Sequence, residues 1–369
     1  MSERYIGLLS GSSMVAIDAV LVRIGEDGCT VDATRSRPIA PETLSGMRRL
    51  VEHPEDAGLE ILGELDVALG REFGAAVLEL LGDSGIAAED VRAIGSHGQT
   101  VMHSPRLDNP FTMQIGDPNV IAAMSGIATV ADFRRKDLAL GGQGAPLVPA
   151  FHTAEFGTPD EHRAVLNLGG IANLTLLQPD GGIAGFDTGP GNTLMDAWTR
   201  RHQGLPYDEH GSWAASAPLN DGLLQELLSH EYFDRPLPKS TGIEEFNLLW
   251  LQGILDGLAK PVAPESVQAT LCELTAISVA NSLTAACPAS GRLFLCGGGA
   301  HNQALVQRLG AHLETWRIEP TDALGIGADW VEAAAFAWLA HRRLEGLPGN
   351  VPAVTGASRE TVLGAIYPA

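Results

Sequence analysis

The chain has 369 residues, a length that suits two domains of ordinary size and exceeds one compact core. Acidic residues outnumber basic residues by 45 to 24, and the net charge of −21 disfavours nucleic acid and anionic membranes as partners. No stretch reaches the roughly 18 consecutive apolar residues of a membrane span. The 4 cysteines form no C-x-x-C pair and the N-terminus lacks signal-peptide character, so we expect reduced thiols and a cytoplasmic protein.

Taken in chain order, the first elements are two apolar strands joined by a small, hydroxyl-rich tip. Residues 5–9 and 17–24 read as these strands. The same pattern returns further along the chain, where residues 164–168 and 174–177 read as strands around a glycine pair. This repetition predicts two lobes of similar build. The tips are Gly11-Ser12-Ser13 and Gly169-Gly170.

Helices are predicted where apolar side chains recur at three- and four-residue spacing. Residues 57–81, 266–286 and 329–345 show this spacing, and a shorter helix over 194–201 follows a Gly-Pro-Gly turn. Because strands and helices alternate, we expect an α/β protein with largely buried sheets.

Domain boundaries are predicted from the position of the second strand pair, since no Pro/Ser-rich linker separates the lobes. We expect an N-terminal lobe over 1–131, joined by the tail 346–369, and a C-terminal lobe over 132–345.

Several common catalytic motifs are missing from the sequence. No Gly-Lys dipeptide occurs, which excludes a P-loop, and there is no G-x-G-x-x-G, H-E-x-x-H or G-x-S-x-G. Asp187-Thr188-Gly189 matches the aspartic-protease tripeptide, but such enzymes need two carboxylates and the chain has one copy. An aspartate that only bonds its own turn is the alternative at this position.

Glycine clusters follow several of the predicted strands. Residues 293–296 form an apolar strand that ends in Gly297-Gly298-Gly299, and Asn302 then precedes a helix. Backbone N–H groups in tight glycine and serine turns form concavities that bind anions. Glycine loops on two lobes therefore favour a phosphotransferase that holds a polyphosphate.

Seven motifs occur in a particular order along the chain. They are GSS (11–13), SHGQT (96–100), ADFRRKD (131–137), GGQGAP (141–146), NLGG (167–170), GFDTGPGN (185–192) and CGGGAHN (296–302). This order resembles the anhydro-N-acetylmuramic acid kinase family, from Tyr5 to the C-terminal Leu363–Pro368.

The resemblance implies the two-lobed actin-like ATPase (ribonuclease H-like) fold, with an active site in the interlobe cleft. It implies ATP-dependent phosphorylation of the 6-oxygen of 1,6-anhydro-N-acetylmuramic acid, with hydrolytic opening of the anhydro ring. The products would be N-acetylmuramic acid 6-phosphate and ADP, in the recycling of peptidoglycan. It further implies Mg²⁺ as cofactor, a homodimer, and a small anhydrosugar as the partner instead of nucleic acid or a membrane.

The resemblance also implies roles for individual residues. Asp187 is similar to the family's catalytic base, and Glu332 to a carboxylate that orients sugar or water, with a solvated helix glutamate as the alternative. Three groups would bind ATP: Gly11, Ser12 and Ser13; Asn167, Gly169 and Gly170; and Gly297, Gly298, Gly299 and Asn302. The substrate would be bound by His97, Gln99, Thr100, Arg134 and Arg135. Metal ligands are not assigned.

One motif departs from the family pattern. The first phosphate loop of the family usually continues with Asp-Gly, where this chain has Val15 and Ala16. Valine offers no oxygen to Mg²⁺ or its waters. A catalytically weakened nucleotide- or sugar-binding relative is therefore one alternative. A glycosidase that pairs Asp187 with Glu332 is another, and it would need no nucleotide.

Overall fold

The computed structural model describes residues 2–11, 14, 16–26, 28–52 and 58–369. The chain divides into two compact units. Unit 1 comprises residues 1–155 and 330–369, and unit 2 comprises residues 156–329. No helix among the described residues combines the length and apolar character that crossing a membrane requires.

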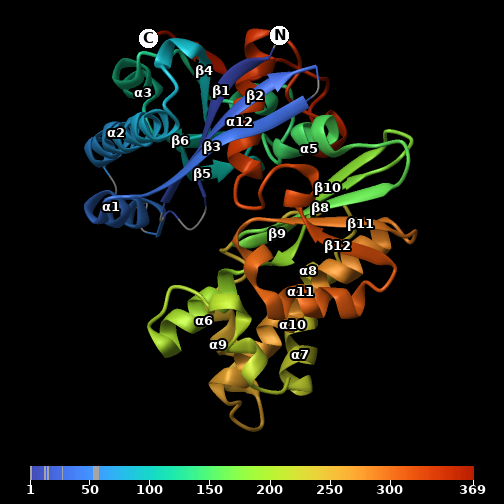
Figure 1. The fold of residues 1–369 in the computed structure, drawn as a ribbon. Coiled ribbons are helices and arrows are strands. Elements are labelled where there is room, and N and C mark those ends of the chain that lie inside the picture. The colour runs from blue at the N-terminus through green and yellow to red at the C-terminus, as the bar shows by residue number, and fades with distance from the viewer. Residues whose placement is uncertain (1, 12–13, 15, 27, 53–57) are drawn as a thin grey trace. The chain divides into compact units, whose positions relative to one another are not determined.

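Unit 1 is built on a six-stranded sheet in the order β13-β7-β4-β1-β2-β3 (Figure 1). Strands β1, β2 and β3 form an antiparallel meander, β4 and β7 continue it in parallel with β1, and β13 pairs antiparallel with β7. The strands are β1 (Glu3–Ser10), β2 (Ala16–Gly25), β3 (Gly28–Pro38), β4 (Val91–Ser96), β7 (Thr129–Ala131) and β13 (Ala365–Tyr367), beside a separate hairpin of β5 (Gln99–Ser104) and β6 (Phe111–Ile115).

Helices cover both faces of this sheet, so β1 is buried along most of its length. Helix α2 packs against β2 and β3 through Leu69, Phe73 and Val77, while α12 packs against β1 and β4. The helices of unit 1 are α1 (Pro41–Glu52), α2 (Leu59–Ser84), α3 (Pro118–Ser125), α4 (Arg135–Leu138), α12 (Val331–Leu344) and α13 (Pro352–Thr355), with α5 (Val148–Phe156) at the boundary and a 3-10 turn η2 (Ala88–Asp90).

Helix α12 approaches the sheet so closely that no side chain fits between them at one point. Gly7 on β1 and Gly95 on β4 are register partners. A Cβ atom on Gly7 would overlap the carbonyl oxygen of Ala333, and one on Gly95 would overlap that of Phe336. Glycine at both strand positions and small residues along α12 therefore allow direct backbone packing.

The bounds of unit 1 differ from the predicted lobe, which ended at residue 131 and regained the chain at 346. Segment 132–155 belongs to unit 1 because carboxylates within this segment accept hydrogen bonds from other residues of unit 1. The Asp137 carboxylate accepts hydrogen bonds from the Asn350 amide (2.7 Å) and the Thr355 hydroxyl (2.8 Å), and Glu155 accepts one from the Cys29 amide (2.8 Å). Residues 330–345 stay with it because they contain α12.

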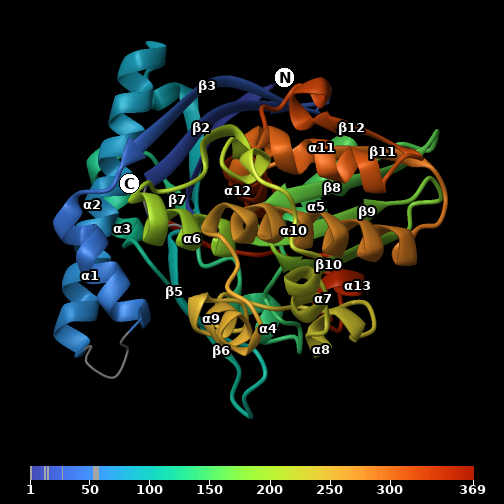
Figure 2. The same ribbon diagram turned by 90° about the horizontal axis from the view of Figure 1, so that it is seen from below.

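Unit 2 repeats the strand order of unit 1 in a five-stranded sheet, β10-β9-β8-β11-β12. Its first three strands are antiparallel, and the last two run parallel to β8. Helix α10 packs against β9 and β10, as Figure 2 shows. The strands are β8 (His162–Leu168), β9 (Ile171–Leu177), β10 (Ile183–Pro190), β11 (Gly291–Cys296) and β12 (Trp316–Pro320).

The remaining elements of unit 2 pack around α10 and the sheet. The apolar core they form includes Leu174, Tyr232, Phe246 and Leu271, all essentially buried. The helices are α6 (Thr193–Gln203), α7 (Asp221–Leu228), α8 (Glu231–Asp234), α9 (Leu248–Gly257), α10 (Pro264–Ala286) and α11 (Gln303–His312), with 3-10 turns η3 (Glu209–Gly211), η4 (Ala214–Ser216), η5 (Gly298–His301) and η6 (Thr321–Leu324).

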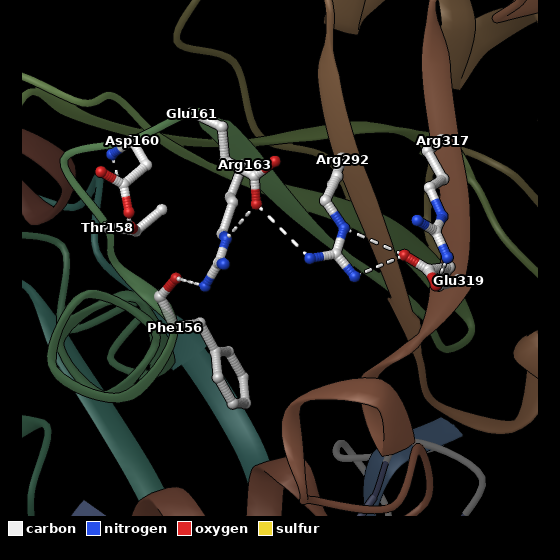
Figure 3. A network of polar contacts seen from close by, with 8 residues as sticks. All are labelled: Phe156, Thr158, Asp160, Glu161, Arg163, Arg292, Arg317 and Glu319. Carbon is white, nitrogen blue, oxygen red and sulfur yellow. Dashed lines mark hydrogen bonds and ion pairs between the residues drawn. The ribbon is translucent and has the colours of Figure 1, made fainter.

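A row of alternating charges crosses the parallel strands of unit 2 (Figure 3). Arg163, Arg292 and Arg317 are register partners on β8, β11 and β12, and like charges in such positions repel. Glu161 and Glu319 separate them, since Arg292 donates to both and Arg317 donates to Glu319. The two glutamate carboxylates thus link the three arginines in one network of hydrogen bonds and ion pairs.

Both predicted strand pairs and all four predicted helices are present, with ends that differ by a few residues. The repeated strand order confirms the prediction of two units of similar build. The first long helix buries most of its predicted apolar positions, namely Leu65, Leu69, Phe73, Val77 and Leu80, while Leu62 is partly buried.

We expect Gly95→Ala to lower the free energy of unfolding by about 1–3 kcal/mol or more, because the new methyl group overlaps the backbone of α12. Urea unfolding of the purified chain measures this change. Gly82→Ala is the control, since Gly82 lies on α2 facing open space and should gain about 0.5–1 kcal/mol. A wild-type midpoint for Gly95→Ala would show that the close approach is not required.

Candidate active site

In unit 2, Asp187 lies on β10, which is the edge strand of its sheet. The pairing of β10 with β9 shifts register between Asp187 and Gly189, so Thr188 forms a β-bulge directly after the aspartate. Bulges bend the strand and re-aim its side chains, and they are enriched beside active sites.

Three polar groups of Asp187 form hydrogen bonds with one segment, residues 232–241. The Asp187 amide donates to the Lys239 carbonyl (2.9 Å), and the Asp187 carbonyl accepts from the Tyr232 hydroxyl (2.7 Å). The Thr241 amide donates to carboxylate oxygen Oδ2 (3.0 Å). Among the described residues, Oδ1 has no hydrogen-bond partner. One carboxylate oxygen is therefore fixed while the other is available.

Burial raises the pKa of Asp187 to about 6, and the hydrogen bond from the Thr241 amide opposes this rise. No neighbouring cation contributes to the shift. A carboxylate with a pKa near 6 is still ionised at neutral pH and accepts a proton more readily than an ordinary aspartate. Asp187 therefore has the environment of a general base.

The two glycine turns that flank this strand pack onto each other. The Gly169 carbonyl accepts from the Asn192 amide (2.8 Å), and the Gly170 carbonyl accepts from the Gly191 amide (2.9 Å). The Asn192 side chain donates to the Leu168 carbonyl (2.7 Å). A Cβ on Gly191 would overlap the Gly169 carbonyl oxygen. The NLGG and GPGN motifs thus form one compact backbone structure.

The third glycine loop lies against the same structure. Gly297 has a φ of 76°, and a Cβ there would overlap the side-chain oxygen of Asn167. A Cβ on Gly299 would come within 2.8 Å of the Asn192 side-chain oxygen, whereas Gly298 faces open space. Asn302 caps helix α11 by accepting from the Leu305 amide (3.0 Å). Unit 2 therefore brings together all of its predicted ATP-binding residues.

The Asn167 side-chain oxygen is a buried acceptor with no hydrogen-bond partner among the described residues. Buried polar atoms are normally paired, and an exception calls for an explanation such as an absent ligand. Its place beside Gly297 and the NLGG turn makes a donor, such as a water bound to the Mg²⁺ of a nucleotide, a suitable partner.

In unit 1, the first phosphate loop follows β1. Ser12, Ser13 and Val15 lie outside the described residues. The Gly11 carbonyl accepts from the Met14 amide (3.0 Å), and Met14 has a φ of 58°, which is left-handed. The described residues on either side of Ser12 and Ser13 are thus joined by a hydrogen bond.

His97 and Arg134 form a buried pair in unit 1. The Arg134 guanidinium donates from Nε (3.0 Å) and Nη2 (2.9 Å) to His97 Nε2, and from Nη1 to the Gly144 carbonyl (2.8 Å). His97 Nδ1 lies 2.9 Å from the Gly98 carbonyl. These contacts assign the proton to Nδ1. Burial and the nearby Arg134 lower the pKa of His97 well below its usual value.

Glu332 on α12 interacts electrostatically with Arg134. Burial lowers the pKa of Arg134 to about 10, and the Glu332 carboxylate opposes this shift. Arg134 therefore remains a cation at neutral pH. Glu332 therefore lies in the electrostatic field of a buried cation, which differs from the surroundings of a fully solvated helix glutamate.

The other predicted substrate residues differ in their surroundings. Gln99 is buried, accepts from the Ser10 hydroxyl (2.7 Å) and donates to the Thr100 carbonyl (3.1 Å), so its amide ties β5 to the end of β1. Thr100 accepts from Gln114 (3.1 Å). Arg135 is exposed and donates to Asp132 (2.7 Å) in a surface ion pair, whereas Arg134 is buried.

A cavity of about 350 Å³ opens in unit 1 beside His97 and Arg135. It is lined by a mixture of acids, amides and a tyrosine that offers both donors and acceptors. Besides those two residues, its polar lining includes Asp66, Gln114, Asp117, Asn119, Asp132 and Tyr367. A polar molecule of sugar size fits such a lining.

Sequence reasoning missed the residues that hold Asp187 and most of the cavity lining. Thr241 lies 54 residues from Asp187 along the chain, and Tyr367 comes from the final strand. The one available signal was the KSTG sequence at 239–242, a polar cluster after two prolines. Nothing local links that cluster to Asp187.

Comparison with known proteins covers the whole chain. A family model described as anhydro-N-acetylmuramic acid kinase matches residues 3–369. Relatives with that name come from Aliivibrio fischeri (49% identical, covering 100% of both chains) and Coxiella burnetii (52% identical, covering 99% of this chain and 97% of the relative). A solved structure of the activator of 2-hydroxyisocaproyl-CoA dehydratase from Clostridium difficile, with bound ADPNP, has a TM-score of 0.45 at 16% identity, over 93% and 97% of the two chains.

The family match and the named relatives define the chain as a carbohydrate kinase, and its sheets and helices place it in the α/β class. It belongs to the anhydro-N-acetylmuramic acid kinase family, and the resemblance seen in its motifs is confirmed.

The His97–Arg134 pair predicts a pH dependence of stability. Because the pKa of folded His97 is depressed, unfolding takes up a proton below about pH 6.5, and stability falls as the pH falls. We expect His97→Gln to reduce this slope by up to about 1.4 kcal/mol per pH unit. Urea unfolding between pH 5 and 7.5 measures it.

The matched control is His210→Gln, which removes an exposed imidazole, so its slope separates the loss of buried His97 from the loss of any histidine. Equal slopes for the wild type and His97→Gln would contradict a neutral His97 in the folded chain.

Proposed function

We propose that the chain transfers the γ-phosphoryl group of Mg²⁺-ATP to the 6-oxygen of 1,6-anhydro-N-acetylmuramic acid while water opens the anhydro ring. The products are N-acetylmuramic acid 6-phosphate and ADP. The observation that carries this proposal is Asp187, a partly buried carboxylate with one oxygen fixed and a pKa of about 6. The family membership of the chain supports the choice of sugar.

The chemistry requires a base, because water must lose a proton as it attacks the anomeric carbon. Asp187 accepts that proton at Oδ1. The bond from the anomeric carbon to the bridging oxygen breaks, and this oxygen attacks the γ-phosphorus as the bond to ADP breaks. The proton on Asp187 then passes to solvent. A positioned base of this kind contributes typically 10²–10⁴-fold to the rate.

The nucleotide would be held by backbone groups and small side chains. Asn167, Gly169 and Gly170 would contact the β-phosphate, and Gly297, Gly298, Gly299 and Asn302 would border the adenosine. The open space at Gly298 supports this assignment, and the unpaired Asn167 oxygen could accept from a water on the Mg²⁺ that the phosphates carry. Gly11, Ser12 and Ser13 would contact the γ-phosphate.

Mg²⁺ supplies charge neutralisation at the transferring phosphoryl group when bound. It commonly keeps several waters in nucleotide sites, so few direct protein ligands are needed.

In unit 1, the substrate would meet a charged pair. Arg134 would neutralise the lactyl carboxylate of the sugar or the phosphoryl group, since its guanidinium stays cationic and suits oxyanions. Glu332 would orient the sugar or the water. His97 would hold Arg134 in place, and Gln99, Thr100 and Arg135 would shape the surrounding wall.

The enzyme would act in the cytoplasm as a homodimer, in the recycling of peptidoglycan fragments. The four cysteines are not joined in disulfides, which agrees with a reducing compartment. The homodimer rests on the family resemblance.

Replacing the base tests the proposal directly. We expect the wild type to release ADP from Mg²⁺-ATP only when 1,6-anhydro-N-acetylmuramic acid is present, and Asp187→Asn to lower this rate about 10²–10⁴-fold. The measurement is a coupled assay of ADP release. Because Asp187 must be ionised, the wild-type rate should rise with pH through about 6. Undiminished sugar-dependent release by Asp187→Asn would refute the role of base.

A weakened relative is the second candidate, because Val15 and Ala16 replace the usual Asp-Gly. If Val15 limits the handling of Mg²⁺, the double substitution Val15→Asp with Ala16→Gly should raise kcat and lower the Mg²⁺ concentration at half-maximal rate. The same coupled assay, titrated with Mg²⁺, measures both quantities. An unchanged Mg²⁺ dependence would show that Val15 does not limit the handling of Mg²⁺.

A further inference from the structure

The segment from Tyr232 to Glu245 completes the edge of the sheet beside Asp187. Strand β10 is an edge strand among the residues that the structure describes, so the backbone groups on its outer side need other partners. Tyr232 and Lys239 supply them through the two hydrogen bonds to the Asp187 backbone. The buried Lys239 ammonium donates to the Tyr232 and Phe233 carbonyls (both 3.1 Å), which fixes the segment against α8.

Thr241 connects this segment to the carboxylate itself. Its amide donates to Asp187 Oδ2, and its hydroxyl donates to Glu245 Oε2 at 2.6 Å. Glu245 in turn accepts from Arg235 at Oε1 (2.7 Å) and Oε2 (3.3 Å). A continuous chain of hydrogen bonds therefore runs from Arg235 through Glu245 and Thr241 to Asp187.

We propose that Glu245 is a positioning residue for Asp187, acting through the hydroxyl and amide of Thr241. Glu245 anchors the Thr241 side chain, and this anchor orients the Thr241 amide toward Oδ2. Oδ1 is thereby aimed at the water to be activated. The inference rests on the proposed role of Asp187 as the base.

The charges around Asp187 make this hydrogen bond important. The groups that face it are the Tyr232 hydroxyl, the Lys239 carbonyl and the Thr241 amide, and the cations Lys239 and Arg235 are engaged elsewhere. The Thr241 amide is therefore the main group that stabilises the ionised form of Asp187. If the Thr241 amide lost this alignment, the pKa of Asp187 would rise and Oδ1 would point in another direction.

Two substitutions interrupt the chain at different points. Thr241→Val keeps the shape and the amide but removes the hydroxyl, and Glu245→Ala removes the anchor. For both, we expect kcat to fall roughly 10- to 100-fold with KM within about twofold, since orientation of the base is lost without loss of substrate contacts. The acid limb of the kcat profile should move upward by about 0.5–1 pH unit. Steady-state ADP release between pH 5 and 8.5 measures all three quantities.

Matched variants separate positioning from a general loss of charge or fold. Glu231→Gln removes the other carboxylate that pairs with Arg235 (2.8 Å) but has no bond to Thr241, and it should leave kcat and the acid limb unchanged. Thr241→Ser restores the hydroxyl and should recover most of the wild-type rate. Thermal unfolding of each variant identifies any that fail to fold. If Glu245→Ala does not fold, Thr241→Val alone tests the positioning role.

The outcomes distinguish this inference from the proposed function. If Asp187→Asn keeps its activity, the proposed base is wrong. If Asp187→Asn is inactive while folded Thr241→Val has the wild-type kcat and acid limb, the positioning role alone is overturned. An equal shift in Glu231→Gln would also overturn it, because the effect would then follow from net charge.

Discussion

The direct contact between helix α12 and the strands β1 and β4 is the constraint on which unit 1 depends. Gly7 and Gly95 bring the helix backbone onto the sheet, so α12 has little freedom to shift or rotate. That position places Phe336 against the His97 ring, with centroids 4.7 Å apart, and sets Glu332 in the field of Arg134. The position of Glu332 relative to Arg134 thus depends on the absence of side chains at two glycine positions of the sheet.

In unit 2, the corresponding structural constraint is the edge of the sheet, where β10 carries Asp187. An edge strand leaves backbone donors and acceptors without partners, and a charged side chain on it would normally be well solvated. The Tyr232–Glu245 segment satisfies the backbone of Asp187 and removes water from one side of its carboxylate. Burial raises the pKa of Asp187 to about 6, and the Thr241 amide of the same segment limits this rise. Stability and reactivity have one structural origin here.

Sequence patterns predicted the local elements well, because apolar spacing and glycine turns act over short distances. The repeated strand pairs and the buried face of α2 followed from such patterns. The motif order predicted the family, and the glycine loops of unit 2 lie together. The contacts of Asp187 with Thr241 and the Asp137 bonds to Asn350 and Thr355 span long separations, so no local pattern contained them. The bonded role of Gln99 depends on Ser10 and was equally hidden.

The two units differ in how their parts are distributed along the chain. Unit 2 is one continuous segment, 156–329, whereas unit 1 needs α12, β13 and the Asn350 and Thr355 partners of Asp137, which all come after it. During synthesis from the N-terminus, unit 2 has all of its residues before unit 1 does. The first sheet to be translated is consequently the last to be completed, and until α12 emerges from the ribosome the Gly7–Gly95 face of that sheet stays uncovered.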